Sequence, residues 1–449
     1  MREFMEASVK EKTRGFSRQA VEELSWQRGE PEWVREKRLA AWDAFEAIPM
    51  PSRTDEEWRR TDIRRLPIDA VAPYTGIAGK VNSVAELPAD VTAALAEDER
   101  RSGLTVQVDS NSVYADLNAD LAGQGVIFTD LATAIDQHPD LVKQYFMTRA
   151  VPNEDSKFAA LHGAFWSGGT FVYVPANTHV EIPLHAHVYG QSLGSSILPH
   201  MLIVAEEGAS VVVVDSWASP TGTDPLLASG VVEIFAKEAS QVRYIQVQDW
   251  GRSAWNFTTQ RAVISQDAVV NMLNVSLGSR LSRNLIASDL IGAGSAAEML
   301  GLYFADERQH LDNQTRQMHI APYATSDLLY KGAIKDRART VYLGVIKVFP
   351  DAQRTDAYQA NRNLLLSRTS RADTMPELEI GANDVRCTHG ATVGQVEEEY
   401  IFYLMSRGIN RTEAVKLIVD GFFDEVIERV PVPEVQETVR AAIARKIGL

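Results

Sequence analysis

Residues 206–214 read EEGASVVVV, in which a small acidic turn is followed by a run of valines. Glycine favours turns, and valine favours strands. Five later segments repeat this order of a turn and an alternating strand. They are AKEASQVRY (236–244), SQDAVVNML (265–273), AGSAAEMLG (293–301), PYATSDLLY (322–330) and FPDAQRTDA (349–357). This part of the chain therefore repeats one structural unit.

The turn alanines of the six segments recur at a nearly constant spacing. They are Ala209, Ala239, Ala268, Ala297, Ala324 and Ala352, and neighbours are 27 to 30 residues apart. A second set of turns holds Arg252, Arg280, Arg308 and Arg337, which are 28 or 29 residues apart. A fixed period of this length, with two strands and two turns per unit, predicts a β-solenoid. We expect it from about residue 165 to residue 369, with the turn alanines stacked along its axis.

Composition places the chain among ordinary globular proteins. Hydrophobic residues make up 45% of its 449 residues, and charged residues make up 23%. The net charge of −15 disfavours binding to nucleic acid, and no run of about 18 apolar residues predicts a membrane span. The first residues lack the apolar stretch of a secretory signal. Cys387 is the only cysteine, which excludes an internal disulfide framework or four-cysteine site and favours a reducing, cytoplasmic location.

Changes in pattern predict three regions. Residues 1–158 are expected to combine helices with a small α/β part. Residues 159–374 are expected to form the β-solenoid core. Residues 375–449 are expected to be helical, and the first of these helices ends at Gly408, a residue type that commonly terminates helices.

The sequence lacks the local motifs of several enzyme classes. It has no GxxxxGK[ST] or GxGxxG phosphate loop, no GxSxG elbow and no HExxH metal site. If ATP is involved, another chain binds it. His185 and His187 lack the nearby glutamate of a cupin metal site, and no carboxylate or cysteine stands at ligand spacing from His310 and His319. We interpret both pairs as structural histidines.

Residues 384–394 read DVRCTHGATVG and bring Cys387 and His389 two positions apart. In an extended segment such residues point the same way. The pair allows three interpretations: a nucleophile with its base, two metal ligands, or a packed corner. A nucleophile needs an orienting third group and an oxyanion donor, and two ligands do not close a four-coordinate metal site. On the residues alone, a buried cysteine with a packing role is favoured.

The sequence around this pair resembles the SufB/SufD family of iron–sulfur cluster assembly proteins. The resemblance rests on LEIGANDVRCTHGATVGQVEEEYIFYLMSRGINRTEAVKLIVDGFF (378–423). It extends through GLYFADERQHLDNQTRQMHIAP (301–322), LYKGAIKDRARTVYLGVIKV (329–348), AYQANRNLLLS (357–367), AFWSGGTFVYVP (164–175) and SRTDEEWRRTDIRRL (52–66). The likeness therefore covers most of the chain.

The resemblance implies a fold and an assembly. The family fold is a right-handed parallel β-helix between N- and C-terminal helical regions, which agrees with the repeat. The implied function is that of a non-catalytic scaffold in the SUF system, where SufB, SufD and the ATPase SufC form a complex that supports cluster assembly and iron acquisition. SufB and SufD pair through their β-helix ends. The C-terminal helices dock SufC, and we expect Gly408, Gly421, Phe422 and Phe423 to mark the docking segment, with an exposed aromatic ring at Phe422 or Phe423.

Two features make the chain similar to the SufD branch of the family. The B type carries glutamate on both sides of the motif histidine, where this chain has Thr388 and Gly390. The B type also has further cysteines, one of them near the position of Ala372. By this resemblance His389, as a metal ligand, and Cys387 would lie at the SufB interface and share a transient iron–sulfur cluster. No cofactor is expected to bind tightly to this chain alone, and a homodimer is the alternative assembly in isolation.

Two other function classes remain as alternatives. A β-helix enzyme acting on polysaccharide would cluster carboxylates and basic residues in a cleft. A cupin-like metalloprotein would need a closed set of ligands. An assembly scaffold instead predicts that loss of the protein impairs several unrelated iron–sulfur enzymes at once.

Overall fold

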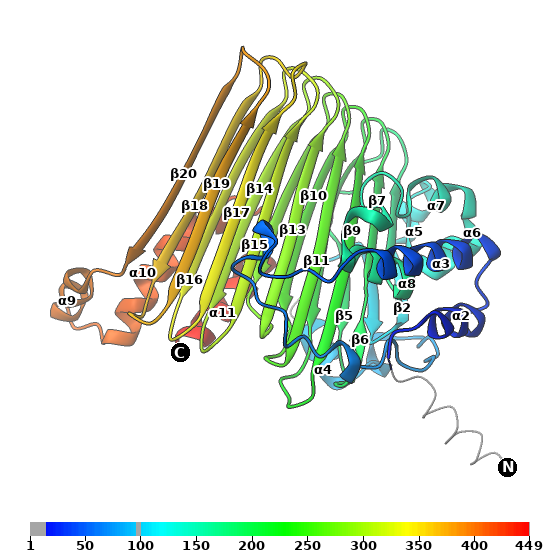
Figure 1. Ribbon diagram of the computed structural model, residues 1–449, viewed down its shortest axis with the longest axis horizontal. Helices are drawn as coiled ribbons and strands as arrows, with labels where there is room; N and C mark the ends of the chain where they lie inside the picture. The colour runs from blue at the N-terminus through cyan, green and yellow to red at the C-terminus, as the bar shows by residue number, and fades with distance from the viewer. Residues whose placement is uncertain (1–14, 96–99, 449) are drawn as a thin grey trace.

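The computed structural model describes residues 15–95 and 100–448, so the predicted region 1–158 lies partly outside the described residues. The body of the protein is a parallel β-solenoid of about eight turns, and each turn contributes one strand to each of two sheets (Figure 1). Helices flank the solenoid at both ends of the chain. The predicted fold, mainly β with a parallel β-solenoid between helical regions, is confirmed.

The first sheet has the strand order β2-β1-β5-β8-β10-β12-β14-β16-β18-β20. Its strands are β1 (Gly103–Val108), β2 (Asn111–Leu117), β5 (Leu184–Tyr189), β8 (Ser210–Ala218), β10 (Gln241–Asp249), β12 (Val269–Ser276), β14 (Ala296–Ala305), β16 (Thr325–Ile334), β18 (Asp356–Leu365) and β20 (Arg386–Gln395).

The second sheet has the order β19-β17-β15-β13-β11-β9-β7-β4-β3, and the short β6 pairs with β9. Its strands are β3 (Ile127–Asp130), β4 (Thr170–Val174), β6 (Ser196–Ile197), β7 (His200–Ala205), β9 (Leu226–Ala236), β11 (Ala254–Ile264), β13 (Leu281–Leu290), β15 (His310–His319), β17 (Arg339–Val348) and β19 (Arg371–Ile380).

The turns that lead into the first sheet stack on a column of small buried residues. Strand register places Ala209, Ser240, Ala268, Ser295, Ala324 and Thr355 in this column, each at most 2% exposed. The residue before each has a positive φ, between 54° and 71°. Ala239, Ala297 and Ala352 lie one to three positions away, so the predicted alanine column is wrong in those three turns. The left-handed turn needs a small residue after it, and serine or threonine meets that need as well as alanine.

The two ends of the solenoid differ. At the N-terminal end, β2 pairs antiparallel with β1 and β3 pairs antiparallel with β4, which ends both sheets. At the other end the last turn consists of β19 and β20. The solenoid therefore continues to Gln395, and the predicted end of the core at residue 374 is wrong. Among the described residues the last turn has a neighbour on one side only. Most of its side chains are therefore exposed, and its sequence lacks the apolar alternation of the inner turns.

Most of the N-terminal region covers the outer face of the second sheet, whereas the helix Ala89–Leu95 packs on the first sheet, against Leu104, Val106 and Tyr189. Its helices are α2 (Arg18–Gln27), α3 (Glu32–Ala47), α4 (Ala89–Leu95), α5 (Ala119–Gly123), α6 (Leu131–Gln137), α7 (Pro139–Tyr145) and α8 (Lys157–Phe165), with short 3-10 turns η1 (Glu56–Trp58), η2 (Ile68–Ala70), η3 (Val84–Glu86) and η4 (Asn153–Asp155). The segment around η1 crosses β11, β13 and β15 (Figure 1). Trp58 packs beside Phe257, and the Arg283 guanidinium lies 3.8 Å from the Trp58 ring centre.

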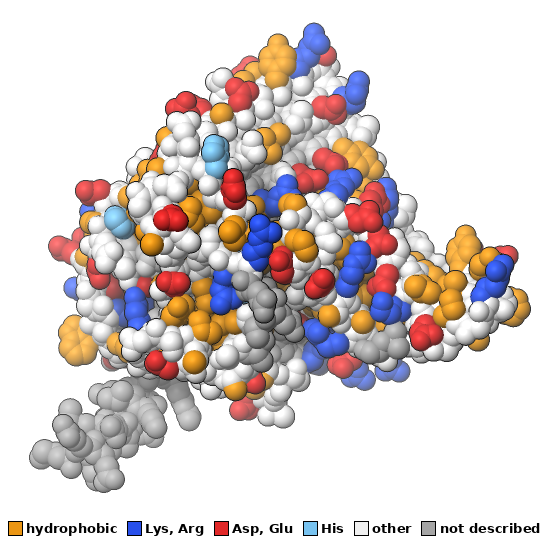
Figure 2. Space-filling model, turned by 180° about the vertical axis from the view of Figure 1, so that it is seen from behind, with side chains coloured by type: hydrophobic (Ala, Val, Ile, Leu, Met, Phe, Trp, Pro, Cys, Tyr) orange, Lys and Arg blue, Asp and Glu red, His pale blue; other side chains and the backbone are white. Residues whose placement is uncertain are grey.

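Two of the three C-terminal helices cover the outer face of the first sheet. These are α10 (Arg411–Ile427) and α11 (Pro433–Ile447), whose buried residues join one apolar cluster with Ile245, Leu302 and Phe304 of the sheet. Helix α9 (Glu398–Ser406) instead projects from the body of the protein and carries hydrophobic side chains on its surface (Figure 2). None of the helices in the described ranges combines the length and the apolar run that a membrane crossing requires.

Candidate functional site

The last turn of the solenoid carries Cys387 and His389. Strand β20 pairs in parallel with β18, so that Cys387 stacks on Ala357 and His389 stacks on Gln359. Ala357 and Gln359 are 1% and 0% exposed, and they face the lumen between the sheets. Registered neighbours in parallel strands point to the same side. Cys387 and His389 therefore face the lumen at its open end, and the predicted common direction of the pair is confirmed.

The outer edge of β20 has no partner among the described residues. The N–H groups of Arg386 and Val396 donate to the carbonyls of Thr355 and Leu365 at 2.8 and 3.2 Å. In a β-strand the N–H groups of successive residues point to opposite sides. The even-numbered residues of β20 point their N–H groups toward β18, so the odd-numbered residues, such as Ala391, point theirs away from it. They present a row of donors at the end of the first sheet.

The edge of β19 is open in the same way. The N–H groups of Arg371 and Gly381 donate to the carbonyls of Ala338 and Val348 at 3.1 and 2.7 Å. By the same alternation, the missing N–H of Pro376 falls on the open side, where an edge strand tolerates proline. Two long unpaired edges at one end of a solenoid are a template for pairing with another chain.

Cys387 is a partly buried free thiol at the inner side of this end. It packs against a cluster that includes Ile346, Val348 and Ala352. Burial raises the pKa of the Cys387 thiol, and the carboxylate of Asp356 raises it further. The thiol is therefore protonated at neutral pH, which argues against an activated nucleophile. A metal ion would have to displace this proton to bind the sulfur.

Gln359, which the sequence motifs did not single out, lies directly beneath His389. Neither its Nε2 nor its Oε1 has a hydrogen-bond partner within the described part of the chain, and the same holds for Oγ1 of Thr374 on β19. Buried polar groups are nearly always paired, so this amide is available to a group or a water that enters the open end. The only sequence signal for Gln359 is its position, one solenoid turn of thirty residues before His389.

The donor set at the open end is incomplete. Within residues 15–95 and 100–448, no group of three or more His, Cys, Asp or Glu side chains could hold a metal ion. Cys387 and His389 supply two donors, both of types that suit iron. A cluster at this end would need its remaining ligands from another chain.

The other histidine pairs have structural contacts. His310 lies 2.9 Å from the hydroxyl of Thr61, and His319 lies 2.8 Å from the hydroxyl of Ser326. These bonds confirm the structural interpretation of that pair. The rings of His185 and His187 stack with centres 6.4 Å apart.

Comparison with known families identifies the chain. Residues 19–186 match the SufBD protein N-terminal region, and residues 188–422 match the SufBD core domain of SUF system FeS cluster assembly. The chain belongs to the SufB/SufD family. The core-domain match includes the last turn with Cys387 and His389, together with α9 and most of α10.

Relatives in this family match nearly the whole chain. The chain is 31% identical over 434 residues to iron–sulfur cluster assembly protein SufB of Bacillus subtilis, which covers 95% of this chain and 92% of that protein. It is 32% identical, with the same coverage, to SufBD family proteins of Staphylococcus saprophyticus and Staphylococcus haemolyticus. The matches to this family therefore cover both the solenoid and the helical regions of the chain.

The residues expected to mark a docking segment are arranged differently from the prediction. Phe423 is 0% exposed. Phe422 is half-buried, and the Lys331 ammonium lies 5.0 Å from the centre of the Phe422 ring. The expected exposure of Phe422 or Phe423 is wrong, because α10 turns this face onto the first sheet. Gly408 ends α9 with φ 89°, as predicted, and Gly421 lies within α10.

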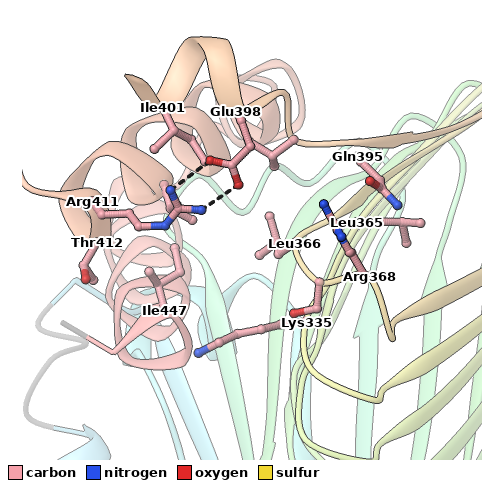
Figure 3. A pocket seen from close by; sticks show the side chains of 13 residues that line it. Lys335, Leu365, Leu366, Arg368, Gln395, Glu398, Ile401, Arg411, Thr412 and Ile447 are labelled. Atoms are coloured by element: carbon pink, nitrogen blue, oxygen red, sulfur yellow. Dashed lines mark hydrogen bonds and ion pairs between the residues drawn. The ribbon is translucent and has the colours of Figure 1, made fainter. Parts of the chain in front are cut away.

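Helix α9 carries the exposed aromatic side chains of this region. Tyr400, Phe402 and Tyr403 are 58%, 72% and 56% exposed. The helix is tied to α10 by two bonds from the Arg411 guanidinium to the Glu398 carboxylate, at 2.7 and 2.9 Å (Figure 3). Beneath these bonds, a cavity of about 310 Å³ separates α9 and the start of α10 from the end of β18.

Proposed function

We propose that this chain is the SufD-type scaffold subunit of the SUF assembly complex and that it is not itself an enzyme. Membership of the SufB/SufD family supports the assembly role. The named relatives are SufB or SufBD family proteins, so the D-type assignment rests on this chain's own residues. These are Thr388 and Gly390 beside the motif histidine, and the single cysteine.

The observation that carries the proposal is the uncapped last turn of the solenoid. The outer edges of β19 and β20 are unpaired within the described residues, and β20 carries Cys387 and His389, two donors that do not complete an iron site by themselves. We propose that the last turn of SufB adds its strands to these edges through backbone hydrogen bonds. The interface would then cover Cys387 and His389 and complete their ligand set.

In this arrangement the iron–sulfur cluster is cargo rather than a resident cofactor. His389, which is exposed, would offer a ring nitrogen to iron in its unprotonated form. Cys387 would become a ligand only when iron displaces its proton. The Gln359 amide would hold the imidazole or a sulfide from below, because it has no hydrogen-bond partner among the described residues.

SufC is the second proposed partner, and α9 is the proposed docking element. Interfaces concentrate their energy in a few aromatic side chains, and α9 exposes three of them on a projecting helix. Helices α10 and α11 would serve as its support. Removing α9, α10 and α11 together would expose the apolar outer face of the first sheet, so single substitutions on α9 are the cleaner test of docking.

The test is to co-express the chain with the SufB and SufC of its own organism. We expect one complex that contains all three proteins, and we expect the strand-edge variant Ala391→Pro to lose SufB while keeping SufC. Recovery of this chain only as a homodimer, with no affinity for SufB, would contradict the proposal. In a deletion strain, we expect several unrelated iron–sulfur enzymes to lose activity together.

A further inference from the structure

The N-terminal layer contains a cavity of about 290 Å³. Its walls come from the loop between α2 and α3, from the start of β2, from α6 and from the residues that follow α8. Helix α2 and strand β20 lie at opposite ends of the molecule (Figure 1). The cavity is therefore separate from the open end of the solenoid, and what it binds does not depend on the function proposed for that end.

Arg28 lines this cavity and has few partners of its own. It is the first residue after α2, and its Nη2 donates to the carbonyl oxygen of Ser110 at 2.5 Å. Its Nε is buried and has no acceptor among the described residues. Within the same residues, no carboxylate forms an ion pair with the Arg28 guanidinium. Buried cations are normally paired, so this guanidinium lacks a counter-ion.

The carboxylate of Glu30, which also lines the cavity, is already taken. Its two oxygens accept from Nη2 and Nε of Arg38 at 2.6 and 2.7 Å. Arg38 is 0% exposed, donates to the carbonyl of Ala164 at 3.1 Å and lies 4.2 Å from the centre of the Trp166 ring. Two guanidinium groups thus share one carboxylate, which leaves this buried cluster with one net positive charge.

The other charged side chains of the cavity wall do not supply the missing negative charge. Lys80 pairs with Asp130 at 2.6 Å, so these two charges cancel. Asp136 is exposed, and water and salt screen its charge from the buried cluster. The charge of Arg28 therefore remains unmatched by the described residues.

We propose that the cavity binds a small organic acid with one carboxylate and an apolar tail, and that the carboxylate pairs with Arg28. The planar guanidinium suits a carboxylate, and one carboxylate balances the single unmatched charge. A phosphate dianion would bring two charges and would be repelled by Asp136. Trp166 and Ile135, at 1% and 4% exposed, and Ile77 at 64% provide an apolar wall for the tail. The volume is at the lower end for ligand pockets, which favours a small molecule.

The surroundings of Arg28 agree with this assignment. Burial, together with the nearby charge of Arg38, lowers the pKa of Arg28 to about 10. The guanidinium therefore stays charged at neutral pH in a place that disfavours the charge. A bound carboxylate would relieve this cost.

Two probes of similar shape test the proposal on the full-length protein: hexanoate, which is charged, and hexanamide, which is neutral. Binding is measured by ligand-observed NMR at constant ionic strength. We expect the wild type to bind hexanoate about tenfold more tightly than hexanamide, as a hydrogen-bonded charge predicts. In Arg28→Gln the two probes should bind equally. Arg35→Gln removes an exposed charge of α3 outside the cavity wall and should behave as the wild type.

Three results would overturn the site. Equal binding of hexanoate and hexanamide by the wild type would leave Arg28 only its bond to Ser110, and this result does not require any variant to fold. A preference for hexanoate that persists in Arg28→Gln would place the recognition of charge elsewhere. Inorganic phosphate should bind more weakly than hexanoate, and tighter binding of phosphate would contradict the single-charge balance.

Discussion

Gln359 lies one turn beneath His389 in strand register, and its amide has no partner in the described part of the chain. The residues of β18 form the layer beneath the last turn. This layer is polar beneath His389, where Gln359 lies, and apolar beneath Cys387, where Ala357 lies. A ligand that reaches His389 also reaches this amide. The open end thus has two layers, of which only the outer one belongs to residues 387–390, the CTHG motif.

Gln359→Met should separate the role of this amide from its effect on stability. Methionine has a similar shape and removes two unpaired buried polar atoms, so the thermal midpoint should stay unchanged or rise. If the amide supports the cluster ligands, cluster occupancy of the SufB-containing complex should fall about tenfold, as is typical when a supporting partner of a metal ligand is removed. The measurement is iron and acid-labile sulfide per complex. Tyr358→Phe, on the outward face of the same strand, is the control and should change neither property.

Cys387 should react slowly with alkylating reagents in the isolated chain. Its raised pKa means that little thiolate is present at neutral pH, so the rate with iodoacetamide should be below that of a small exposed thiol and should rise with pH. Cys387→Ser then distinguishes two roles in the complex. If the thiol only packs, stability falls slightly and cluster yield is kept; if it ligates iron, the yield falls as well. A fast reaction at pH 7 would contradict the assigned environment.

Ala391→Pro should block pairing with SufB without unfolding the chain. The N–H of Ala391 points to the open side of β20, so proline removes a donor that the chain itself does not use. Thr392→Pro is the matched control, because the N–H of Thr392 points toward β18. We expect the first variant to keep the wild-type thermal midpoint and lose SufB in co-purification, whereas the second should lower the midpoint. Normal SufB recovery with Ala391→Pro would exclude strand addition at this edge.

Phe402→Ala on α9 should weaken SufC binding by about 2 kcal/mol or more, as expected for an aromatic anchor at the centre of an interface. Phe402 is 72% exposed, so the stability of the chain should not change. Leu417→Ala, at 49% exposed on α10, is a surface control. Titration calorimetry with purified SufC gives the affinities, and equal affinity for Phe402→Ala and the wild type would move the docking site away from α9.

The solenoid could be predicted because its turns repeat a physical requirement. Each inner turn passes through a left-handed residue and then a small buried one, and this fixes the period more firmly than any strand residue does. The identity of the small residue is not fixed, which is why alanine alone gave the wrong column at Ala239, Ala297 and Ala352. The direction of Cys387 and His389 followed from strand alternation alone.

The last turn and its surroundings could not be predicted from pattern. β19 has no neighbour on one side in the described part of the chain, and its sequence accordingly contains Pro376 and several charges, unlike the buried strands before it. Phe423 is apolar and lies beside Phe422 in sequence, and only the packing of α10 on the first sheet decides which ring is covered. Gln359 lies beneath His389 only because β18 and β20 pair in register, thirty residues apart in sequence, and no local motif contains that information.

The most direct test of the account is the cluster content of a His389→Ala complex. Alanine removes the imidazole nitrogen without adding bulk at an exposed position, so the complex with SufB and SufC should still assemble. We predict that iron and sulfide per complex, after reconstitution under reducing conditions, fall severalfold below the wild type while the subunit ratio is unchanged. Wild-type cluster content in a fully assembled His389→Ala complex would contradict the assignment of the open end as a cluster site and leave the CTHG motif with a structural role.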